Sequence, residues 1–293
     1  MMKDFIEYLK NEKHKAENTL IAYERDIKGF EQFLTERRGK TLADCAESDA
    51  IAYVLSMGKE NKSKATINRK VSALRTYCDF LIGQSVLDTN PFAGIKSGKS
   101  DKREIDYLTL EDVEALLALP SDDRKGLRDK ALMEFMYGTG ARVTEVVRLR
   151  IEDVNLRMSF VTLRDVNDES RIVPLGRYAR EALVEYLEGT YDSMKGSEKK
   201  GEDYVFINLR GEQLTRQGIW KILKNYGEKL GLAERMTPQI LRDSFAVHIL
   251  KNGGDLKSLQ ELMGFEDMSI GIAYLAVTDI HVRDVFKRCH PRA

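Results

Sequence analysis

Apolar residues in the first ninety positions recur at three- and four-residue spacing, the period of a helix with one buried face. The segment NTLIAYERDIKGFEQFL shows the pattern most clearly, and Asn18 or Thr19 is expected to cap its start. Further helices are predicted at 48–57, 63–82 and 85–88. The first region is therefore expected to be a compact helical bundle, whose longest helix buries Leu20, Tyr23, Ile27, Phe30 and Leu34.

The periodic pattern stops at NPFAGIKSGKSDKREIDYLT, where a proline, two glycines and a polar, basic run interrupt it. Such a stretch is typical of a linker between domains. The sequence therefore predicts a first domain at 1–95, a linker at 96–106 and a second domain at 107–293.

The second region mixes helices with strands. Thr109 is expected to cap a helix, and LRDKALMEFMYGTGARVTEVVRL predicts two helices separated by the glycine turn at 138–140. SFVTLRDVNDESRIVPL is typical of two short strands, 159–164 and 171–175, around a polar turn. Helices are predicted again from 177 onward, with an exposed loop near 195–203. The expected fold class is mainly α, with a small β-sheet in the second domain.

Composition and apolar runs place the chain among ordinary globular proteins. Of its 293 residues, 42% are hydrophobic and 32% charged, and charges interrupt every apolar run well short of a membrane span. We expect a cytoplasmic protein with no signal peptide and no membrane segment. Cys45, Cys78 and Cys289 are odd in number and widely spaced, which argues against a disulfide framework and against a thiolate metal site.

The net charge and the local charge clusters give opposite indications of whether the chain binds nucleic acid. The formal net charge is zero, whereas a nucleic-acid-binding domain is usually basic. The dense cationic cluster NKSKATINRKVSALR nevertheless contains no acid. Such a run is commonly only a solvated helix face, so its candidate DNA contacts need further support. They are Lys62, Lys64, Arg69, Lys70 and Arg75.

Four motifs of the second region are informative because of their order and spacing: GTGARVTEVVRL, RIVPLG, TPQILRDSF and LMGFEDMSIGIAYL. Together they resemble the tyrosine recombinases, most closely the Xer and phage-integrase branch. NTLIAYERDIKGF and SKATINRKVSALRTYCDF also resemble that family's N-terminal domain, so the similarity covers essentially the whole chain. The resemblance implies a two-domain clamp on duplex DNA, in which a helical core-binding bundle joins an α-rich catalytic domain.

The resemblance assigns roles by motif: Arg142 and Arg242 match the two phosphate-binding arginines, and Tyr274 matches the nucleophile. Attack of a side-chain oxygen on a phosphodiester builds negative charge on phosphorus, which planar guanidinium groups are suited to stabilise. Thr237 is expected to cap the TPQILRDSF helix, and Gln239 lies three residues before Arg242, on the same face near the positive helix end.

Three positions depart from the family pattern. Val166 stands where the family has a hairpin Lys, Gln239 replaces the His of its His-x-x-Arg motif, and Phe265 replaces a later His or Trp. No Lys occurs between Met158 and Asp192, so the loss of the lysine does not depend on the alignment. In the family, Lys is thought to protonate the departing 5′ oxygen, and His to help move the tyrosyl proton.

Because the lysine and the histidine of the family pattern are missing, the cleavage reaction is predicted to be slow. Glutamine cannot exchange a proton, and each general acid or base contributes roughly 10²–10⁴ in rate. Arg164 lies two residues before Val166 and would share its strand face if the strand continues, so it is a candidate DNA contact and a partial substitute for the lysine.

We therefore interpret the chain as a site-specific recombinase-like protein that binds duplex DNA with paired half-sites. It is expected to cleave and rejoin strands through a 3′-phosphotyrosyl intermediate, weakly or together with a second, catalytically complete recombinase. No cofactor or metal is implied, because the phosphotyrosine conserves the phosphodiester energy. The C-terminal segment AVTDIHVRDVFKRCHPRA has an apolar stripe, which the resemblance links to self-association as a tetramer on DNA. The stripe consists of Val277, Ile280, Val285 and Phe286.

Alternatives remain open. The three departures also fit a catalytically impaired paralogue that occupies one half-site as a DNA-binding partner subunit. A third possibility is an architectural or transcriptional DNA-binding protein that uses only the helical bundle. Individually, Arg142 is also explained by a surface ion pair with Glu145, and Tyr274 by burial in a core. The C-terminal stripe is also explained by docking onto its own domain.

Overall fold

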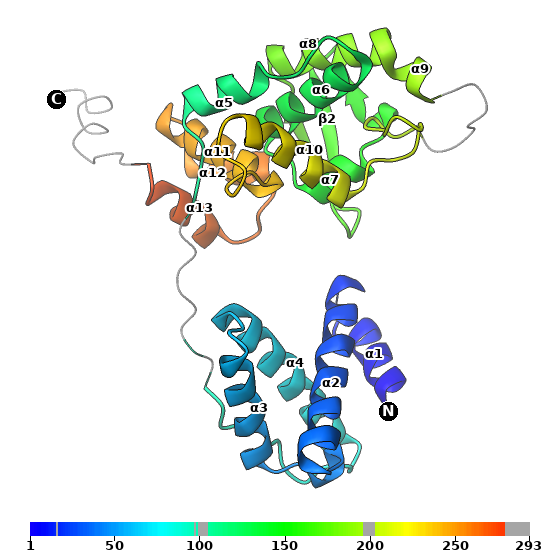
Figure 1. Ribbon diagram of the computed structural model, residues 1–293, viewed down its shortest axis with the longest axis vertical. Coiled ribbons are helices and arrows are strands. Elements are labelled where there is room, and N and C mark those ends of the chain that lie inside the picture. Colours follow the sequence, from blue (N-terminus) through cyan, green and yellow to red (C-terminus); the bar gives the residue numbers. More distant parts are fainter. Residues whose placement is uncertain (16, 97, 99–104, 196–202, 279–293) are drawn as a thin grey trace, which may run out of the picture. The chain divides into compact units, whose positions relative to one another are not determined.

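The computed structural model describes residues 1–15, 17–96, 98, 105–195 and 203–278. The chain divides into two compact units, Met1–Arg103 and Glu104–Ala293, each with its own hydrophobic core (Figure 1). The predicted mainly helical, two-domain architecture is confirmed. Most of the predicted linker, 96–106, lies outside the described residues, so the domain limits at 95 and 107 stay a prediction.

The N-terminal unit is a helical bundle, as predicted. Its elements are α1 (Met2–Asn11), α2 (Glu17–Arg38), the short 3₁₀ turn η1 (Leu42–Asp44), α3 (Glu47–Lys59) and α4 (Lys64–Gly83). The apolar stripe of α2 lies in the core, where Ile27, Phe30 and Leu34 are fully buried and the Phe30 ring meets Phe92 edge-on.

Two local predictions for this unit are wrong. Helix α2 begins at Glu17, so residues 18 and 19 lie inside the helix and not at the cap position before it. Residues 85–88 form no helix, because α4 ends at Gly83 and Ser85 adopts a φ of +57°, which lies outside the helical region.

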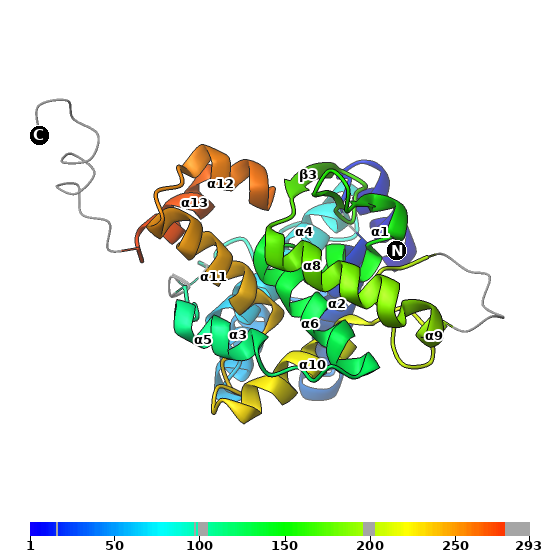
Figure 2. The same ribbon diagram turned by 90° about the horizontal axis from the view of Figure 1, so that it is seen from above.

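The C-terminal unit contains α5 (Leu110–Leu117), α6 (Arg124–Thr139), α7 (Val143–Arg148), η2 (Ile151–Asp153), β1 (Val154–Asn155), β2 (Phe160–Arg164), β3 (Ser170–Pro174), α8 (Arg177–Tyr186), η3 (Leu187–Tyr191), α9 (Asp192–Lys195), α10 (Arg216–Lys229), α11 (Pro238–Lys251), α12 (Leu256–Met263) and α13 (Met268–Leu275). Helix α6 lies beside α8 and α11, and α11, α12 and α13 form a neighbouring group (Figure 2). Thr109 caps α5 as predicted, by accepting from the Asp112 amide at 3.1 Å. Among the described residues, no helix has the length and apolar character needed to span a bilayer.

The sheet is an antiparallel β1-β2-β3 meander, and its β2-β3 hairpin matches the two predicted strands to within a residue. The last pair of the hairpin is Arg164 with Ser170. Beyond it, the Asp165 carboxylate accepts from the backbone amides of Asn167, at 2.7 Å, and Glu169, at 3.0 Å, and so closes the turn. Val166 therefore lies in an exposed turn, because β2 ends at Arg164, and the condition under which Val166 would share the strand face of Arg164 is not met.

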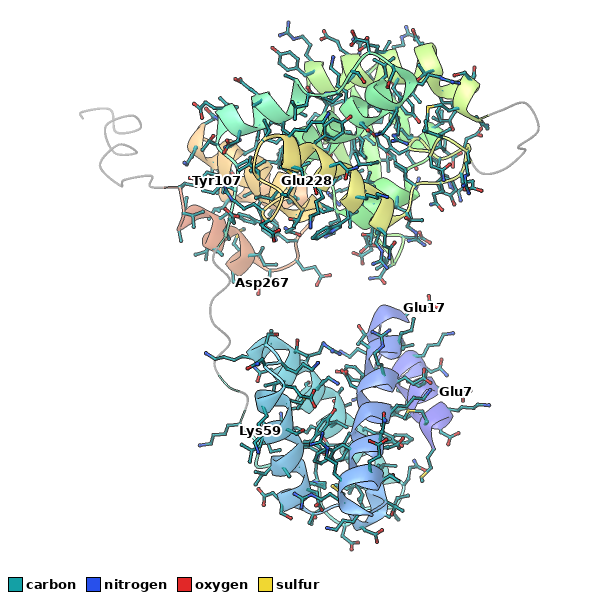
Figure 3. All side chains as sticks on the ribbon, in the orientation of Figure 1. Glu7, Glu17, Lys59, Tyr107, Glu228 and Asp267 are labelled. Carbon is teal, nitrogen blue, oxygen red and sulfur yellow. The ribbon has the colours of Figure 1, made fainter. Side chains whose placement is uncertain are left out.

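Two turns around α11 prepare the site. Gly140 ends α6 with a φ of +61°, and a Cβ there would lie 2.5 Å from the Phe245 ring, so only glycine fits. Asp267, which is labelled in Figure 3, caps α13 by accepting from the Ser269 amide at 2.8 Å. The first turn brings backbone close to α11, which carries one of the predicted arginines, and the second begins α13, which packs against α11.

Candidate active site

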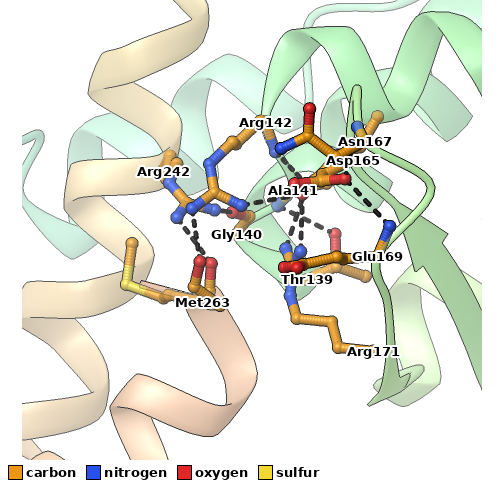
Figure 4. Close-up of polar contacts among 12 residues, drawn as sticks. Thr139, Gly140, Ala141, Arg142, Asp165, Asn167, Glu169, Arg171, Arg242 and Met263 are labelled. Carbon is orange, nitrogen blue, oxygen red and sulfur yellow. Dashed lines mark hydrogen bonds and ion pairs between the residues drawn. The ribbon is translucent and has the colours of Figure 1, made fainter. Parts of the chain in front are cut away.

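Arg242 lies in the first turns of α11, which begins as predicted with Thr237 as its cap and a proline at the first helical position. Its side chain is buried, and its guanidinium donates to two backbone carbonyls (Figure 4). One is the Gly140 oxygen of the turn after α6, and the other is the Met263 oxygen at the end of α12, at 2.7 Å. Arg242 is thus fixed before any ligand binds.

Arg142 is the N-cap residue of α7, and the ion pair that the sequence offered as an alternative is present. Its Nη1 donates to Glu145 Oε1 at 2.9 Å, and its backbone amide donates to Oε2 at 2.6 Å. The pair is not confined to the surface, because the Glu145 side chain is completely buried. Arg142 Nη2 also donates to the Gly264 carbonyl, which ties this arginine to the end of α12.

Arg171 of β3 completes the cluster and was not predicted. It binds both carboxylate oxygens of Glu145, through Nη1 to Oε1 at 2.5 Å and Nη2 to Oε2 at 2.9 Å. Its Nε donates to the Leu262 carbonyl at 2.7 Å. The available sequence signal was its position inside the RIVPLG motif, on a strand of the predicted hairpin.

The end of α12 organises these three arginines. Its successive carbonyls at Leu262, Met263 and Gly264 accept from Arg171, Arg242 and Arg142 respectively. The last carbonyls of a helix have no partner within the helix and carry the negative end of its dipole, so cations are favoured there. One helix end therefore gathers cations from β3, α11 and the start of α7.

The charges of this cluster are stable at neutral pH. Burial, followed by the charges of Arg142 and Arg171, lowers the pKa of Arg242 to about 10, which leaves it protonated. Burial alone would raise the pKa of Glu145, but its hydrogen bonds and ion pairs with Arg171 and Arg142 hold that pKa below the ordinary value. The cluster is therefore a preformed cationic site around one ionised glutamate.

Tyr274 lies on α13, which packs against α11, and its side chain is buried. Its Oη donates to Asp243 Oδ1 at 2.6 Å, and the Gln239 side-chain amide donates to the same oxygen at 2.8 Å. Three of the four predicted catalytic residues, Arg242, Gln239 and Tyr274, thus meet on or against α11. Asp243, which links two of them, was not predicted, although its place in TPQILRDSF was visible.

The positions that depart from the family pattern have clear structural roles. Phe265 is buried in a small core together with Tyr274, and its ring would lie 3.2 Å from a Cβ at Gly271. Val166 is 47% exposed in the hairpin turn. Arg164 pairs with Asp153 through Nη2 at 3.2 Å, so its guanidinium has a partner of its own at the base of the hairpin.

The N-terminal cationic cluster differs from its sequence description, because folding brings an acid to it. Asp26 of α2 is buried and accepts from Arg69, and Lys70 Nζ lies 3.4 Å from its other carboxylate oxygen. Lys62 lies 3.8 Å from Glu60. The acid-free run is therefore partly neutralised in three dimensions.

Arg75 is used inside the bundle. Its Nη2 donates to the Ile95 carbonyl at 2.6 Å and its Nε to the Phe92 carbonyl at 3.3 Å. These bonds attach the segment that leaves the bundle to α4, so Arg75 has a structural role that its place in a basic run did not reveal.

A second cationic face, on α10, was not predicted from the sequence. Arg216, Trp220 and Lys224 follow one another at four-residue spacing on a single helix face, with Lys221 beside them, and together they line a shallow hollow. Trp220 is 46% exposed. Exposed aromatic and basic side chains at helical spacing were a signal that sequence reasoning could have used.

Comparisons with known proteins match both units of the chain. A model of the phage integrase family matches residues 106–281, and a model of the phage integrase N-terminal SAM-like domain matches residues 2–85. The chain is 38% identical to tyrosine recombinase XerD of Listeria innocua, over 100% of this chain and 99% of that protein. It is 34% identical to tyrosine recombinase XerD of Staphylococcus epidermidis, with the same two coverages.

Solved structures show the same fold. The Tn1549 transposon integrase, in complex with a circular intermediate DNA, matches with a TM-score of 0.76 and 19% identity over 98% of each chain. The XerH site-specific recombinase, bound to a palindromic difH substrate, matches with a TM-score of 0.74 and 17% identity over 98% of this chain and 84% of that one.

Proposed function

Because the chain belongs to the phage integrase family, we propose that it is a tyrosine site-specific recombinase that cuts and rejoins duplex DNA. The observation that carries the proposal is the gathering of Arg142 and Arg242 on neighbouring carbonyls of α12, with the buried Tyr274 on the adjoining helix. Fixed guanidinium groups and a nearby hydroxyl nucleophile are the parts that phosphoryl transfer requires.

In the proposed reaction, the two arginines hold the non-bridging oxygens of the scissile phosphate. Tyr274 Oη attacks phosphorus, the strand's 5′ oxygen leaves, and a 3′-phosphotyrosyl bond joins protein to DNA. Attack by the 5′ hydroxyl of another strand on that bond restores the phosphodiester and releases the tyrosine. Arg142, with its side chain 36% exposed, reaches incoming DNA more readily than the buried Arg242.

We propose that the catalytic set is incomplete, so the reaction is slow or depends on a partner recombinase. Val166 offers no proton to the leaving oxygen, and the amide of Gln239 does not exchange one. Each lost acid or base accounts for a factor of roughly 10²–10⁴ if it acts independently.

Two cationic faces are proposed to contact the DNA backbone. One consists of Lys62, Lys64, Arg69 and Lys70 in the N-terminal bundle, and we leave Arg75 out because its guanidinium binds carbonyls of its own domain. The other is the α10 face around Trp220. We propose that domains 1–95 and 107–293, joined by the linker 96–106, close around duplex DNA as a clamp.

Self-association on paired half-sites is proposed by analogy with a lambda integrase dimer bound to a core site. Action in the cytoplasm is proposed by analogy with the XerD relatives. The C-terminal stripe predicted to mediate this assembly includes Ile280, Val285 and Phe286, which lie outside the described residues.

Incubation with a nicked half-site tests the proposal, because cleavage releases a short fragment that ends in a 5′ hydroxyl and leaves the protein joined to the DNA. A covalent protein–DNA band is expected for the natural protein and not for Tyr274→Phe. If a band forms only when a complete partner recombinase is added, and it contains the partner's tyrosine, the chain is instead a DNA-binding partner subunit. Binding without any band under either condition would favour the architectural alternative.

A further inference from the structure

We propose that Asp243 is the proton acceptor for Tyr274, so that its buried carboxylate supplies the base that position 239 lacks. The inference rests on the proposed function, since it assigns a role within the cleavage reaction. It follows from a direct contact on the nucleophile itself, because Tyr274 Oη donates its proton to Asp243 Oδ1 at 2.6 Å. A base must lie within hydrogen-bond reach of the proton that it removes, and this carboxylate does.

The surroundings of the pair support a functional contact. Asp243 and Tyr274 are 2% and 6% exposed, so little water surrounds the bond between them. Gln239, one helical turn earlier on α11, donates its amide to the same Oδ1 atom at 2.8 Å. Since an amide only donates or accepts hydrogen bonds, it orients the carboxylate without taking its place as the base. The glutamine at the family's histidine position thereby acquires a positioning role.

The timing of the proton transfer follows from ordinary acidities. Carboxyl and phenol groups ionise about six pKa units apart in model peptides, so a carboxylate does not ionise a resting tyrosine. As the Oη–P bond forms, however, the phenolic oxygen becomes an ester oxygen and its proton becomes strongly acidic. A carboxylate can then accept it, as the catalytic-loop Asp of protein kinases accepts the proton of a substrate hydroxyl.

The step balances without any redox partner. The Tyr274 Oη–P bond forms and the P–O5′ bond breaks, while the proton on Oη moves to Asp243 Oδ1. The departing 5′ oxygen takes a proton from a water molecule, whose hydroxide passes to bulk solvent, and the products are a 5′ hydroxyl and a 3′-phosphotyrosine. In the joining step the same carboxyl returns its proton to Oη as the tyrosine leaves, which follows from microscopic reversibility.

Asp243→Asn is the primary test, because asparagine keeps the size and an acceptor oxygen but takes no proton. We expect adduct formation on the nicked half-site to slow by about 10²–10⁴-fold, the range for loss of a general base. Half-site binding should not change. In the same variant, Tyr274 is then replaced by a fluorinated tyrosine whose phenol is already ionised at neutral pH. Because that nucleophile needs no base, we expect it to restore most of the lost rate.

Asp129→Asn is the matched control. Asp129 is another buried carboxylate of the same unit and accepts from Tyr226 Oη at 3.1 Å, and its ion pair, at 2.6 Å, is with Arg128, which is not one of the three clustered arginines. Its adduct rate should stay near the natural one, and thermal unfolding of each variant measures its folded fraction.

Three outcomes separate the two proposals. An unchanged or faster rate in Asp243→Asn overturns the inference, because the carboxylate then only holds the tyrosine in place. Slowing that the fluorinated tyrosine does not relieve also overturns it, since the effect is then structural. If the natural protein forms no adduct through Tyr274, alone or with a partner, the proposed function fails first.

Discussion

Two buried carboxylates, Asp26 in the N-terminal unit and Glu145 in the C-terminal unit, each bind two cations, but with different consequences. Arg69 and Lys70, the partners of Asp26, have side chains 45% and 19% exposed. The partners of Glu145, Arg142 and Arg171, are also fixed by carbonyls of α12. The first arrangement therefore leaves cations that can exchange a carboxylate for a phosphate at a surface, whereas the second is a rigid site formed before DNA arrives.

This difference separates binding from catalysis. Salt screens charges that reach solvent, as the half-exposed Arg69 does from the buried Asp26, so the Asp26 cluster suits backbone contacts that form and break. Arg142 and Arg171 are each held twice, by the buried Glu145 and by a carbonyl at the end of α12, so neither moves away without losing both contacts. The Glu145 cluster accordingly suits a site that must position a phosphate before chemistry.

The largest effect is expected from replacing the residues of the rigid site. Arg242→Lys cannot bridge the Gly140 and Met263 carbonyls with a planar fork, so adduct formation should fall by at least about 10²-fold. Tyr274→Phe should abolish the adduct completely. The assay is the nicked half-site reaction, and half-site affinity serves as the control. A normal rate in Arg242→Lys would show that the fork geometry does not matter.

Val166→Lys should act in the opposite direction. The position lies in an exposed turn, so a lysine fits without disturbing the fold and can protonate the leaving 5′ oxygen. We expect adduct formation to accelerate by about 10²-fold, the lower end of the range for a general acid. Combination with Gln239→His tests the second lost group. If neither the single nor the double variant is faster, the alignment of the missing groups is wrong.

The next largest effect is expected on the free energy of unfolding, which should differ between variants of the two carboxylates. Glu145→Gln should lower the free energy of unfolding of its unit by about 3–5 kcal/mol, because the buried Arg171 loses a partner that it binds through two hydrogen bonds. Asp26→Asn should cost less than about 2 kcal/mol, since Arg69, which makes the shortest contact with Asp26, is half-exposed and stays hydrated.

Denaturant titration checks this contrast, because the single tryptophan, Trp220, reports by fluorescence on the C-terminal unit. Glu145→Gln should move that transition, and Asp26→Asn should change only the circular dichroism of the other unit. Equal shifts in both signals would mean that the carboxylates are equivalent.

Acid should weaken the Glu145 cluster in a defined direction. Its folded pKa lies below the ordinary value of 4.5, so its contribution to stability is present above that pH and is lost as the pH falls below it. The Trp220 transition should therefore weaken in acid more steeply in the natural protein than in Glu145→Gln. If the stabilities of the natural protein and of Glu145→Gln fall in parallel as the pH is lowered, Glu145 is not the cause of the acid sensitivity.

The smallest effect is expected for DNA affinity. Replacing Lys64, Arg69 and Lys70 by Ala should weaken binding to all DNA sequences. The slope of the logarithm of the binding constant against the logarithm of the salt concentration should also become shallower, by at most about three units. Three units is an upper limit because Arg69 and Lys70 are already paired with Asp26. Mobility-shift titrations at two salt concentrations measure both quantities. Unchanged binding at both would remove this face from the clamp. The control replaces three exposed lysines near the chain start, Lys3, Lys10 and Lys13.

Much of the fold could be predicted because local patterns carry it. The stripe along α2 is buried at Ile27 and Phe30, the hairpin strands lie where alternation placed them, and Thr237 caps α11. The failures were also local, at the start of α2 and at 85–88, where single backbone conformations decide helix ends.

By itself, the sequence determined the helices, the hairpin and the order of Arg142, Arg242 and Tyr274, because each depends on neighbours a few residues away or on a motif. Tertiary structure decided which charges meet. It placed Asp26 against Arg69, aligned three α12 carbonyls with three arginines and set Asp243 on the hydroxyl of Tyr274. These contacts join residues far apart in the chain, and hydrogen bonds and ion pairs depend on distances of a few ångströms that only packing of the helices sets.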